Sequence, residues 1–545
     1  MGQAAGQPGG GHGAGSRTRL WLGSALVAAV VVAWRNRFIQ DDAFISLRYA
    51  RHLVDGHGLV WNAGERVEGY TNFLWTMLGA VPLRLGMDPV GFLQVAGVLL
   101  FVVTLAAYAR LVRGLSGNHE MVIPAVVALG FFYSFSAYAT GGLETQLQAT
   151  LVTLTAGVAT AAAREGRLGL GRAAVAGGLS GLALLTRLDS AVFLVPMLGV
   201  TAGRLLVPFR ARAAVEVALV AMIPLVVTGA WFAWKLGFYG HLLPNTLAAK
   251  TVGWWPAEGC RFLGSFVLSY AFLPIPLAAG LALQHGWRDR RSVEWLTLGA
   301  PVIAWVLYVA AVGGDFMEYR MLVPALPLAL ALAFWGVWLR WRSVGAAWLL
   351  AAAVLAGSEF HRRFSNPYRF GGPEPVRSLA ARLAPEGDQW RGIGERLGTA
   401  FGEGVRPRIA VTAAGAIPFF SELPAVDMLG LNDPELHRFE EISGYGPGHS
   451  RLSPLDLLLE RQVHFLIAHP VLKDRSAVPP TGEYSLDDFS EGRTFRFRDE
   501  ARLRGMPLIE VPLEGDKVLL MVYLTRDPAI DRRLDELGWK WYPAS

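Results

Sequence analysis

Long runs of apolar residues, separated by short polar segments, occupy positions 20–358 of this chain. A helix that crosses a membrane needs roughly 20 mostly apolar residues. About eleven runs approach that length. They are 20–34, 90–111, 121–138, 145–163, 173–188, 191–206, 213–234, 262–283, 293–312, 321–339 and 343–357. The pattern predicts a polytopic α-helical membrane protein with about eleven transmembrane helices.

Arginines gather at alternate ends of these runs. They are Arg17 and Arg19, Arg110 and Arg113, Arg164, Arg167 and Arg172, Arg204, Arg210 and Arg212, Arg288, Arg290 and Arg291, and Arg340 and Arg342. Short cytoplasmic loops carry an excess of basic residues, so the N-terminus is predicted to be cytoplasmic. An odd number of spans then places the C-terminal region outside the membrane.

This orientation requires the apolar segment 71–85 not to cross the membrane. The segment is short and contains Pro82 and Arg84. We expect it to form a helix in the outer interface. Counted as a span, it would invert every later loop.

Charged residues become frequent after position 358, which predicts a domain boundary. We expect a cytoplasmic disordered tail at 1–19, a transmembrane module at 20–358 with a long first outer loop at 35–89, and a soluble α/β extracytoplasmic domain at 359–545. The predicted elements of that last domain are strands at 408–412 and 463–468, a short helix after the turn 414–416, a helix at 455–462, and a hairpin formed by 508–512 and 517–523.

The composition excludes several classes of protein. Hydrophobic residues make up 53% of the chain and charged residues 17%, and the mean hydropathy is +0.35. Cys260 is the single cysteine, so no intrachain disulfide or cysteine metal cluster can form. The 50 basic and 44 acidic residues form no basic stripe, which argues against nucleic-acid binding. No GxxxxGK[ST] or GxGxxG motif indicates a soluble nucleotide donor, so a membrane-borne donor is the consistent alternative.

Two neighbouring carboxylates, Asp41 and Asp42, follow the first apolar run directly. One carboxylate is enough to cap a helix, and a pair can also titrate at different pH values or share a cation. We predict that Asp41 and Asp42 are catalytic, with one of them acting as the general base for a sugar hydroxyl. Asp41, Asp42 and Glu68 are also oxygen ligands of the kind that Mg²⁺ or Mn²⁺ prefers. The pattern leaves open whether they hold a cation or whether one carboxylate works alone.

Further polar residues lie in loops on the same predicted outer side. A single loop of this kind is as often ordinary interfacial solvation as a site, but their common side favours a site. The candidates for binding a donor phosphate are Arg187, Lys250 and Arg320. The candidates for binding substrate are Arg48, Glu68, Tyr70, Glu144, Asp189, Asn245 and Asp315.

Several of these segments resemble the outer loops of GT-C glycosyltransferases, and in particular the group of the mycobacterial terminal arabinofuranosyltransferase. The segments are Asp41-Asp42-Ala43-Phe44-Ile45, Gly56-His57-Gly58-Leu59, Glu68-Gly69-Tyr70-Thr71-Asn72, Gly141-Gly142-Leu143-Glu144, Thr186-Arg187-Leu188-Asp189, Leu243-Pro244-Asn245-Thr246, Gly314-Asp315-Phe316 and Asp427-Met428-Leu429-Gly430.

The resemblance implies a GT-C fold in a bacterial plasma membrane. It also implies inverting transfer of a sugar, arabinofuranose in the named case, from a polyprenyl-phosphate donor to a cell-envelope glycan or glycolipid on the outer face. In that group the membrane-proximal pair Asp41 and Asp42 would be catalytic. Two alternatives remain: a transporter or flippase of a lipid-linked sugar, and a GT-C transferase that modifies protein. A transporter should show internal repeats and broken helices near the middle of the membrane, and the apolar runs indicate neither.

Overall fold

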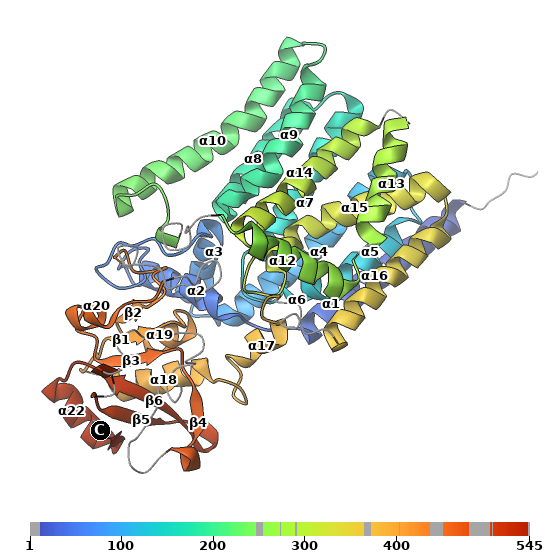
Figure 1. Ribbon diagram of the computed structural model, residues 1–545. Coiled ribbons are helices and arrows are strands. Elements are labelled where there is room, and N and C mark those ends of the chain that lie inside the picture. The colour runs from blue at the N-terminus through green and yellow to red at the C-terminus, as the bar shows by residue number, and fades with distance from the viewer. Residues whose placement is uncertain are drawn as a thin grey trace, which may run out of the picture.

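The computed structural model describes residues 11–246, 254–272, 274–288, 291–364, 372–402, 404–435, 451–478, 502–503 and 505–542. A bundle of long helices lies beside a smaller part that contains a β-sheet (Figure 1). Helices α2 and α3 and the short helix α17 lie between the two parts (Figure 1).

The helical bundle and the segments that belong to it extend to Phe364. Its elements are α1 (Gly11–Arg35), α2 (Asp41–Val54), α3 (Phe73–Arg84), α4 (Pro89–Ser116), α5 (Val122–Gly130), α6 (Tyr133–Ala137), α7 (Thr145–Glu165), α8 (Leu170–Thr186), η1 (Leu188–Ser190), α9 (Ala191–Leu206), α10 (Ala211–Tyr239), α12 (Pro256–Tyr270), α13 (Pro274–Arg288), α14 (Ser292–Val312), η2 (Arg320–Ala325), α15 (Leu326–Trp341) and α16 (Val344–Phe364).

Six helices of the described chain are long and apolar enough to cross a membrane, or seven if the bent pair α12–α13 is one span. The chain is therefore a multi-pass helical membrane protein, although fewer helices pass this criterion than the apolar runs predicted. The run 121–138 is divided into α5 and α6, and the run 262–283 becomes two helices bent by 100°. The outward faces of the long helices are apolar: Leu99, Leu225, Leu307 and Leu349 are all exposed. Such faces suit lipid, because they would be costly in water.

The predicted disordered tail is wrong in its second half. Helix α1 begins at Gly11, so residues 11–19 continue the first apolar helix. Residues 1–10 lie outside the described chain. The segment 71–85, which was predicted not to cross the membrane, forms α3, a helix of 12 residues that is too short to span a bilayer.

The second part contains α17 (Val376–Ala381), α18 (Trp390–Phe401), α19 (Ala416–Ser421), α20 (Leu455–Glu460), η5 (Arg475–Ala477), η7 (Glu514–Asp516) and α22 (Pro528–Leu537). Its strands are β1 (Ile409–Val411), β2 (Ala425–Asp427), β3 (Phe465–Ala468), β4 (Leu472–Asp474), β5 (Leu508–Pro512), β6 (Lys517–Tyr523) and β7 (Lys540–Tyr542).

These seven strands form one mixed sheet in the order β2-β1-β3-β6-β5-β7, with β4 also paired to β6. Strand β1 is parallel to β2 and β3, whereas β6 is antiparallel to β3 and β5. The sequence-based prediction of strands around 408–412 and 463–468 and of the late hairpin is confirmed. The predicted helices after 416 and from 455 are confirmed as α19 and α20.

Helix α2 connects the two parts, because it packs against α3 on one side and α19 on the other. Arg48, at the centre of α2, is 3% exposed. Its guanidinium donates hydrogen bonds to the carbonyl oxygens of Trp61 (2.7 Å), Leu423 (2.8 Å) and Pro418, and to Oδ1 of Asn62 (3.1 Å). The buried cation of Arg48 thus joins the sheet-containing part to the loop that follows α2.

Candidate active site

A cavity of about 1010 Å³ lies where the first outer loop meets the ends of the long helices. Its lining contains both polar and apolar side chains. The polar residues that line it are Asp42, Ser46, Glu68, Tyr70, Thr71, Asn72, Glu144, Arg187, Asp189, Thr246, Tyr308, Asp315 and Arg320. The apolar and aromatic residues include Trp231, Leu243, Trp254, Trp255, Ala304, Leu307 and Ala311.

The structure separates the two predicted catalytic carboxylates. Asp42 lines the cavity and is partly exposed. Asp41 does not line it: its carboxylate is 6% exposed and accepts the backbone N–H groups of Gly415 (3.1 Å) and Ala416 (2.7 Å) at the start of α19. Gly415 allows this approach, since a Cβ at that position would collide with the backbone of Asp41. Of the predicted catalytic pair, the structure therefore places only Asp42 in the cavity, whereas Asp41 links α2 to the sheet-containing part.

Burial raises the pKa of the Asp41 carboxyl to about 7. The hydrogen bonds from the N–H groups of Ala416 and Gly415 lower this pKa in part, and the negative charge of Asp42 raises it further. A folded state with the higher pKa binds the proton more tightly than the unfolded chain, whose Asp titrates near 4. The contribution of the Asp41 carboxyl to the free energy of unfolding is therefore full below about pH 4 and is lost as the pH rises towards 7. We expect the thermal-unfolding midpoint of the detergent-solubilised protein to fall between pH 5 and pH 8, and to fall less in Asp41→Asn. Equal slopes for the two proteins would contradict this.

Three of the charged residues that line the cavity form an ion-pair network. Arg187, between α8 and η1, contacts Oδ2 of Asp189 (2.6 Å) and Oε1 of Glu144 (2.7 Å). Burial alone would raise the pKa of Glu144, but Arg187 and Arg320 outweigh it and lower that pKa. Burial likewise opposes the charge on Arg187, and Asp189 and Glu144 together raise its pKa above the ordinary value. Glu144 and Arg187 are therefore ionised at neutral pH.

Asn72 joins this network to α2, a role that the sequence analysis missed. Its Nδ2 donates to Oε2 of Glu144 (2.9 Å) and lies 3.0 Å from Oγ of Ser46, one helical turn after Asp42. The Thr76 hydroxyl donates to Oδ1 of Asn72 (3.0 Å). The signal was present in the sequence, because Asn72 stands at the end of the Glu68–Asn72 segment, immediately before α3.

A second cation lies near the first. Arg320, at the start of η2, contacts Oδ2 of Asp315 through its Nε (2.7 Å). Both residues line the cavity. Arg320 also lies close enough to Asp42 and Glu144 to interact with them electrostatically. The structure therefore brings together Asp42, Glu144, Arg187, Asp315 and Arg320, which the sequence places in separate loops.

Glu68, which also lines the cavity, forms a separate ion pair with Lys235. Glu68 lies 2.6 Å from Nζ of Lys235, which is fully buried in α10. The contact is an ion pair rather than a well-directed hydrogen bond. Burial raises the pKa of Glu68 to about 7, although Lys235 acts in the opposite direction. Tyr70 follows on the same wall, with its hydroxyl 3.3 Å from that of Tyr239. Lys235 directly follows the apolar run 213–234, where a lysine is usually an ordinary helix-end residue, so the sequence did not single it out.

Two predicted substrate ligands have structural partners instead. All recorded hydrogen bonds of Arg48 go to protein groups, and it does not line the cavity. Asn245 donates its Nδ2 to the carbonyl oxygens of Gly430 (2.7 Å), Leu431 (3.1 Å) and Asp433 (2.9 Å). Both residues join the sheet-containing part to the helical part and neither lines the cavity, so substrate binding by either of them stays a prediction. Lys250 lies outside the described residues.

The proposed metal ligands Asp41, Asp42 and Glu68 do not converge. Glu68 is occupied by Lys235, and Asp41 is occupied by two backbone N–H groups. Over the ranges that the structure describes, no group of three His, Cys, Asp or Glu side chains is arranged to hold a metal ion. This trio therefore does not fit a cation site.

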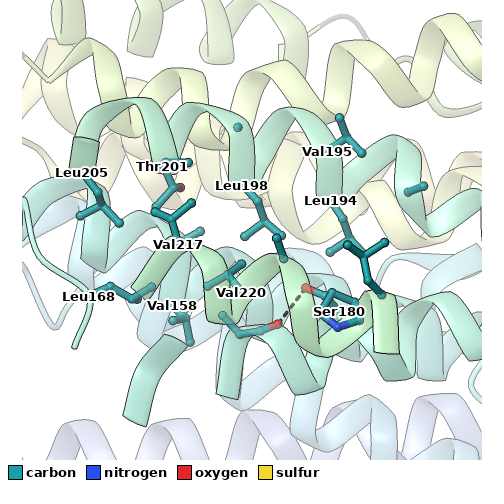
Figure 2. A pocket seen from close by; sticks show the side chains of 18 of the residues that line it. Val158, Leu168, Ser180, Leu194, Val195, Leu198, Thr201, Leu205, Val217 and Val220 are labelled. Carbon is teal, nitrogen blue, oxygen red and sulfur yellow. Dashed lines mark hydrogen bonds between the residues drawn. The ribbon is translucent and has the colours of Figure 1, made fainter. Parts of the chain in front are cut away.

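A second cavity, of about 390 Å³, lies between α8, α9 and α10 (Figure 2). Its labelled side chains are almost all aliphatic (Figure 2). The hydroxyls of Ser180 and Thr201 donate to carbonyls of their own helices, those of Ala176 (2.7 Å) and Met197 (2.9 Å). The cavity presents hydrocarbon and no group that could take part in acid–base chemistry.

Solved structures with a similar arrangement are membrane transferases. ArnT from Cupriavidus metallidurans bound to undecaprenyl phosphate matches with a TM-score of 0.53 and 14% identity, over 93% of this chain and 98% of that chain. The oligosaccharyltransferase AglB from Archaeoglobus fulgidus, in complex with an inhibitory peptide and a dolichol-phosphate, matches with a TM-score of 0.50 and 11% identity, over 90% and 73%. This chain has the GT-C fold.

Two curated relatives match part of this chain in sequence. The terminal β-(1→2)-arabinofuranosyltransferase of Corynebacterium glutamicum is 30% identical over 346 residues, which are 56% of this chain and 48% of the relative. The protein of the same name from Mycobacterium tuberculosis is 29% identical over 360 residues, 58% and 55% of the two chains. The chain thus spans about half the length of the curated relatives it matches. Residues 381–508 also match the model of a family described as a domain of unknown function, DUF8728.

Proposed function

We propose that this protein is a glycosyltransferase that moves a sugar from a polyprenyl-phosphate donor to a cell-envelope glycan or glycolipid. The observation that carries the proposal is the cavity itself. A carboxylate, Asp42, and two arginines, Arg187 and Arg320, line the same cavity as the apolar and aromatic side chains of α10 and α14, among them Trp231, Ala304 and Leu307. A lipid phosphate needs both surfaces at once, whereas a soluble sugar nucleotide would not need the apolar one.

The reaction that fits these groups is a single displacement with inversion. Asp42 takes the proton of an acceptor hydroxyl, whose oxygen attacks the anomeric carbon of the donor sugar. The bond between that carbon and the phosphate oxygen breaks, and the polyprenyl phosphate leaves with the bonding electrons. Arginines stabilise the additional negative charge on the phosphate through paired N–H groups.

Arg320 is the better placed of the two arginines to hold the phosphate. Among the residues that the structure describes, Arg320 is hydrogen-bonded only through Nε, to Asp315, so both of its terminal nitrogens remain for a ligand. Arg187 uses Nε and both terminal nitrogens on Asp189 and Glu144. We infer that Arg320 grips the phosphate directly, and that Arg187 mainly orders the two carboxylates beside it.

Arabinofuranose is the donor sugar that we propose to test first, because both curated relatives are named for its transfer. We further propose eleven membrane passages, with α1 entering from the cytoplasm and the sheet-containing part outside. The helices from α1 to α16 support this count if α5–α6 and α12–α13 each make one passage. Asp42 serves as the base without a metal in this proposal; loss of transfer on EDTA dialysis that Mg²⁺ or Mn²⁺ reverses would overturn that part.

Sugar transfer by the purified, detergent-solubilised protein tests the proposal. Decaprenyl-phosphoryl arabinofuranose, other polyprenyl-phosphate sugars and an oligosaccharide acceptor would be supplied together. We expect transfer by the wild type and, in Arg320→Gln, a roughly ten- to hundredfold lower kcat/KM for the donor, since a charge-assisted contact to the phosphate is lost. Arg340→Gln, at the other end of α15, is the matched control and should transfer normally.

Transport is the competing function, and the bent pair α12–α13 is the feature that favours it, because transporters use broken helices. Those two helices contribute no residue to the polar cavity. Movement of a lipid-linked sugar across reconstituted vesicles, without transfer to any acceptor, would establish transport instead.

A further inference from the structure

The loop between α14 and η2 contributes Gly314, Asp315 and Phe316 to the cavity, and Arg320 follows it as the first residue of η2. The loop also carries a second acid, Glu318, that faces elsewhere. Glu318 is 2% exposed and does not line the cavity. Its Oε1 lies 2.8 Å from Nε2 of His361 on α16, and its Oε2 accepts the backbone N–H of Val376 at 2.7 Å. The carboxylate therefore holds the loop against a membrane helix and against the segment that leads to the sheet.

The backbone makes the same connection. The N–H of Glu318 donates to the carbonyl of Glu374 (2.9 Å), and the N–H of Glu374 donates to the carbonyl of Phe316 (2.7 Å). Met317 and Glu374 form an isolated parallel bridge. The loop thus has the segment before α17 as a short strand-like partner.

That partner segment is itself tied to the sheet. Glu374 lies 3.3 Å from Nε of Arg382. Nη1 of Arg382 contacts Oδ2 of Asp388 (2.9 Å) and Nε2 of His469 (3.2 Å), and His469 directly follows β3. A continuous chain of contacts therefore runs from the end of β3 to Glu318, two residues before Arg320.

The conformation of the loop depends on such contacts. Tyr319, directly before Arg320, has φ of 48°, in the left-handed region that non-glycine residues rarely adopt. Gly314 has φ of 80°, and a Cβ there would collide with the ring of Phe262. A backbone in this region persists when its surroundings hold it in place. Released from Glu318, the loop would relax and move Arg320.

We propose that Glu318 is a positioning residue that transmits the placement of the 372–376 segment to Arg320, and so sets how the donor phosphate is held. This inference rests on the proposed function, because it assigns the phosphate to Arg320. It goes beyond that function in making phosphate binding depend on the sheet-containing part, whose described residues contribute only Leu431 to the cavity.

A proline at position 376 removes one hydrogen bond of this connection with little other change. Val376 is the first residue of α17 and follows Pro375. Proline is well tolerated at the first helical position, where its missing N–H is not needed by the helix. The matched control is Leu455→Pro, because Leu455 is also a buried first residue of a six-residue helix and also follows a proline, Pro454.

The experiment measures KM for donor and acceptor separately, and the affinity for polyprenyl phosphate alone, which needs no turnover. In Val376→Pro we expect donor KM and the dissociation constant for polyprenyl phosphate to rise about three- to tenfold. Glu318→Ala should lower donor kcat/KM by about ten- to a hundredfold, and Glu318→Gln, which keeps an acceptor for Val376, should recover part of it. Acceptor KM should stay within about twofold in every variant.

Unchanged polyprenyl phosphate affinity in both Val376→Pro and Glu318→Ala would overturn the inference. Equal losses in Val376→Pro and Leu455→Pro would overturn it as well, since the effect would then be general destabilisation. A wild type that binds polyprenyl phosphate but transfers no sugar would count against the proposed function only, because the affinity measurement still reads the position of Arg320.

Discussion

Replacement of Asp42 by asparagine is expected to lower kcat for sugar transfer by about a hundred- to ten-thousandfold. Asparagine has nearly the same shape and cannot take a proton from the acceptor hydroxyl. Asp42 is the member of the acidic pair that lines the cavity, close enough to Arg320 for an electrostatic interaction. The measurement is transfer from the active polyprenyl-phosphate sugar under saturating conditions, with thermal unfolding of the variant as the test of its fold.

Asp41→Asn is the matched control, on the neighbouring residue of the same helix. Asparagine keeps one acceptor for the N–H of Ala416 and loses the second acceptor, so we expect lower stability and a kcat reduced less than about tenfold. A larger loss of kcat in Asp41→Asn than in Asp42→Asn would reverse the assignment. It would mean that the carboxylate of Asp41 leaves Gly415 and Ala416 and turns into the cavity when substrates bind.

Arg48→Met is expected to lower the free energy of unfolding by about 3 kcal/mol or more. Methionine fills much of the volume and provides no donor for the carbonyls of Trp61, Pro418 and Leu423, which the arginine now satisfies. The loss falls at the junction between α2 and α19, so the sheet-containing part should also become easier to cleave from the membrane part. Thermal unfolding and limited proteolysis measure the two effects.

Arg51→Met, about one turn further along α2, is the control for that result. Arg51 pairs with the exposed carboxylate of Glu422 at 2.7 Å and donates to one carbonyl of α19, that of Phe419, at 2.9 Å. Because Arg48 satisfies three buried carbonyls and Arg51 one, we expect the smaller loss in Arg51→Met. The folded fraction of Arg48→Met should keep the wild-type KM for both substrates. A stable Arg48→Met protein with a raised KM would restore the sequence-based interpretation of Arg48 as a substrate ligand.

Several outer-loop candidates could be recognised without the structure, because charged residues at the mouths of apolar helices are costly unless they have partners. Glu144, Arg187, Asp189, Asp315 and Arg320 were found in this way, and all line one cavity. Lys235 was missed, since a lysine that directly follows an apolar run is usually an ordinary helix-end residue. Arg48 and Asn245, which the sequence also offered as substrate ligands, bind carbonyls of their own chain and do not line the cavity, and a sequence cannot distinguish the two situations.

The sequence by itself determined that this chain is a helical membrane protein followed by a sheet-containing part, because the length of apolar runs and the frequency of charge are local properties. It also placed an acidic pair at the start of the first outer helix. Tertiary structure alone decided which of the two carboxylates faces the cavity, because that depends on the backbone N–H groups of Gly415 and Ala416, more than 370 residues away. The partners of Glu318 and Arg48 were decided in the same way, by contacts between segments that only folding brings together.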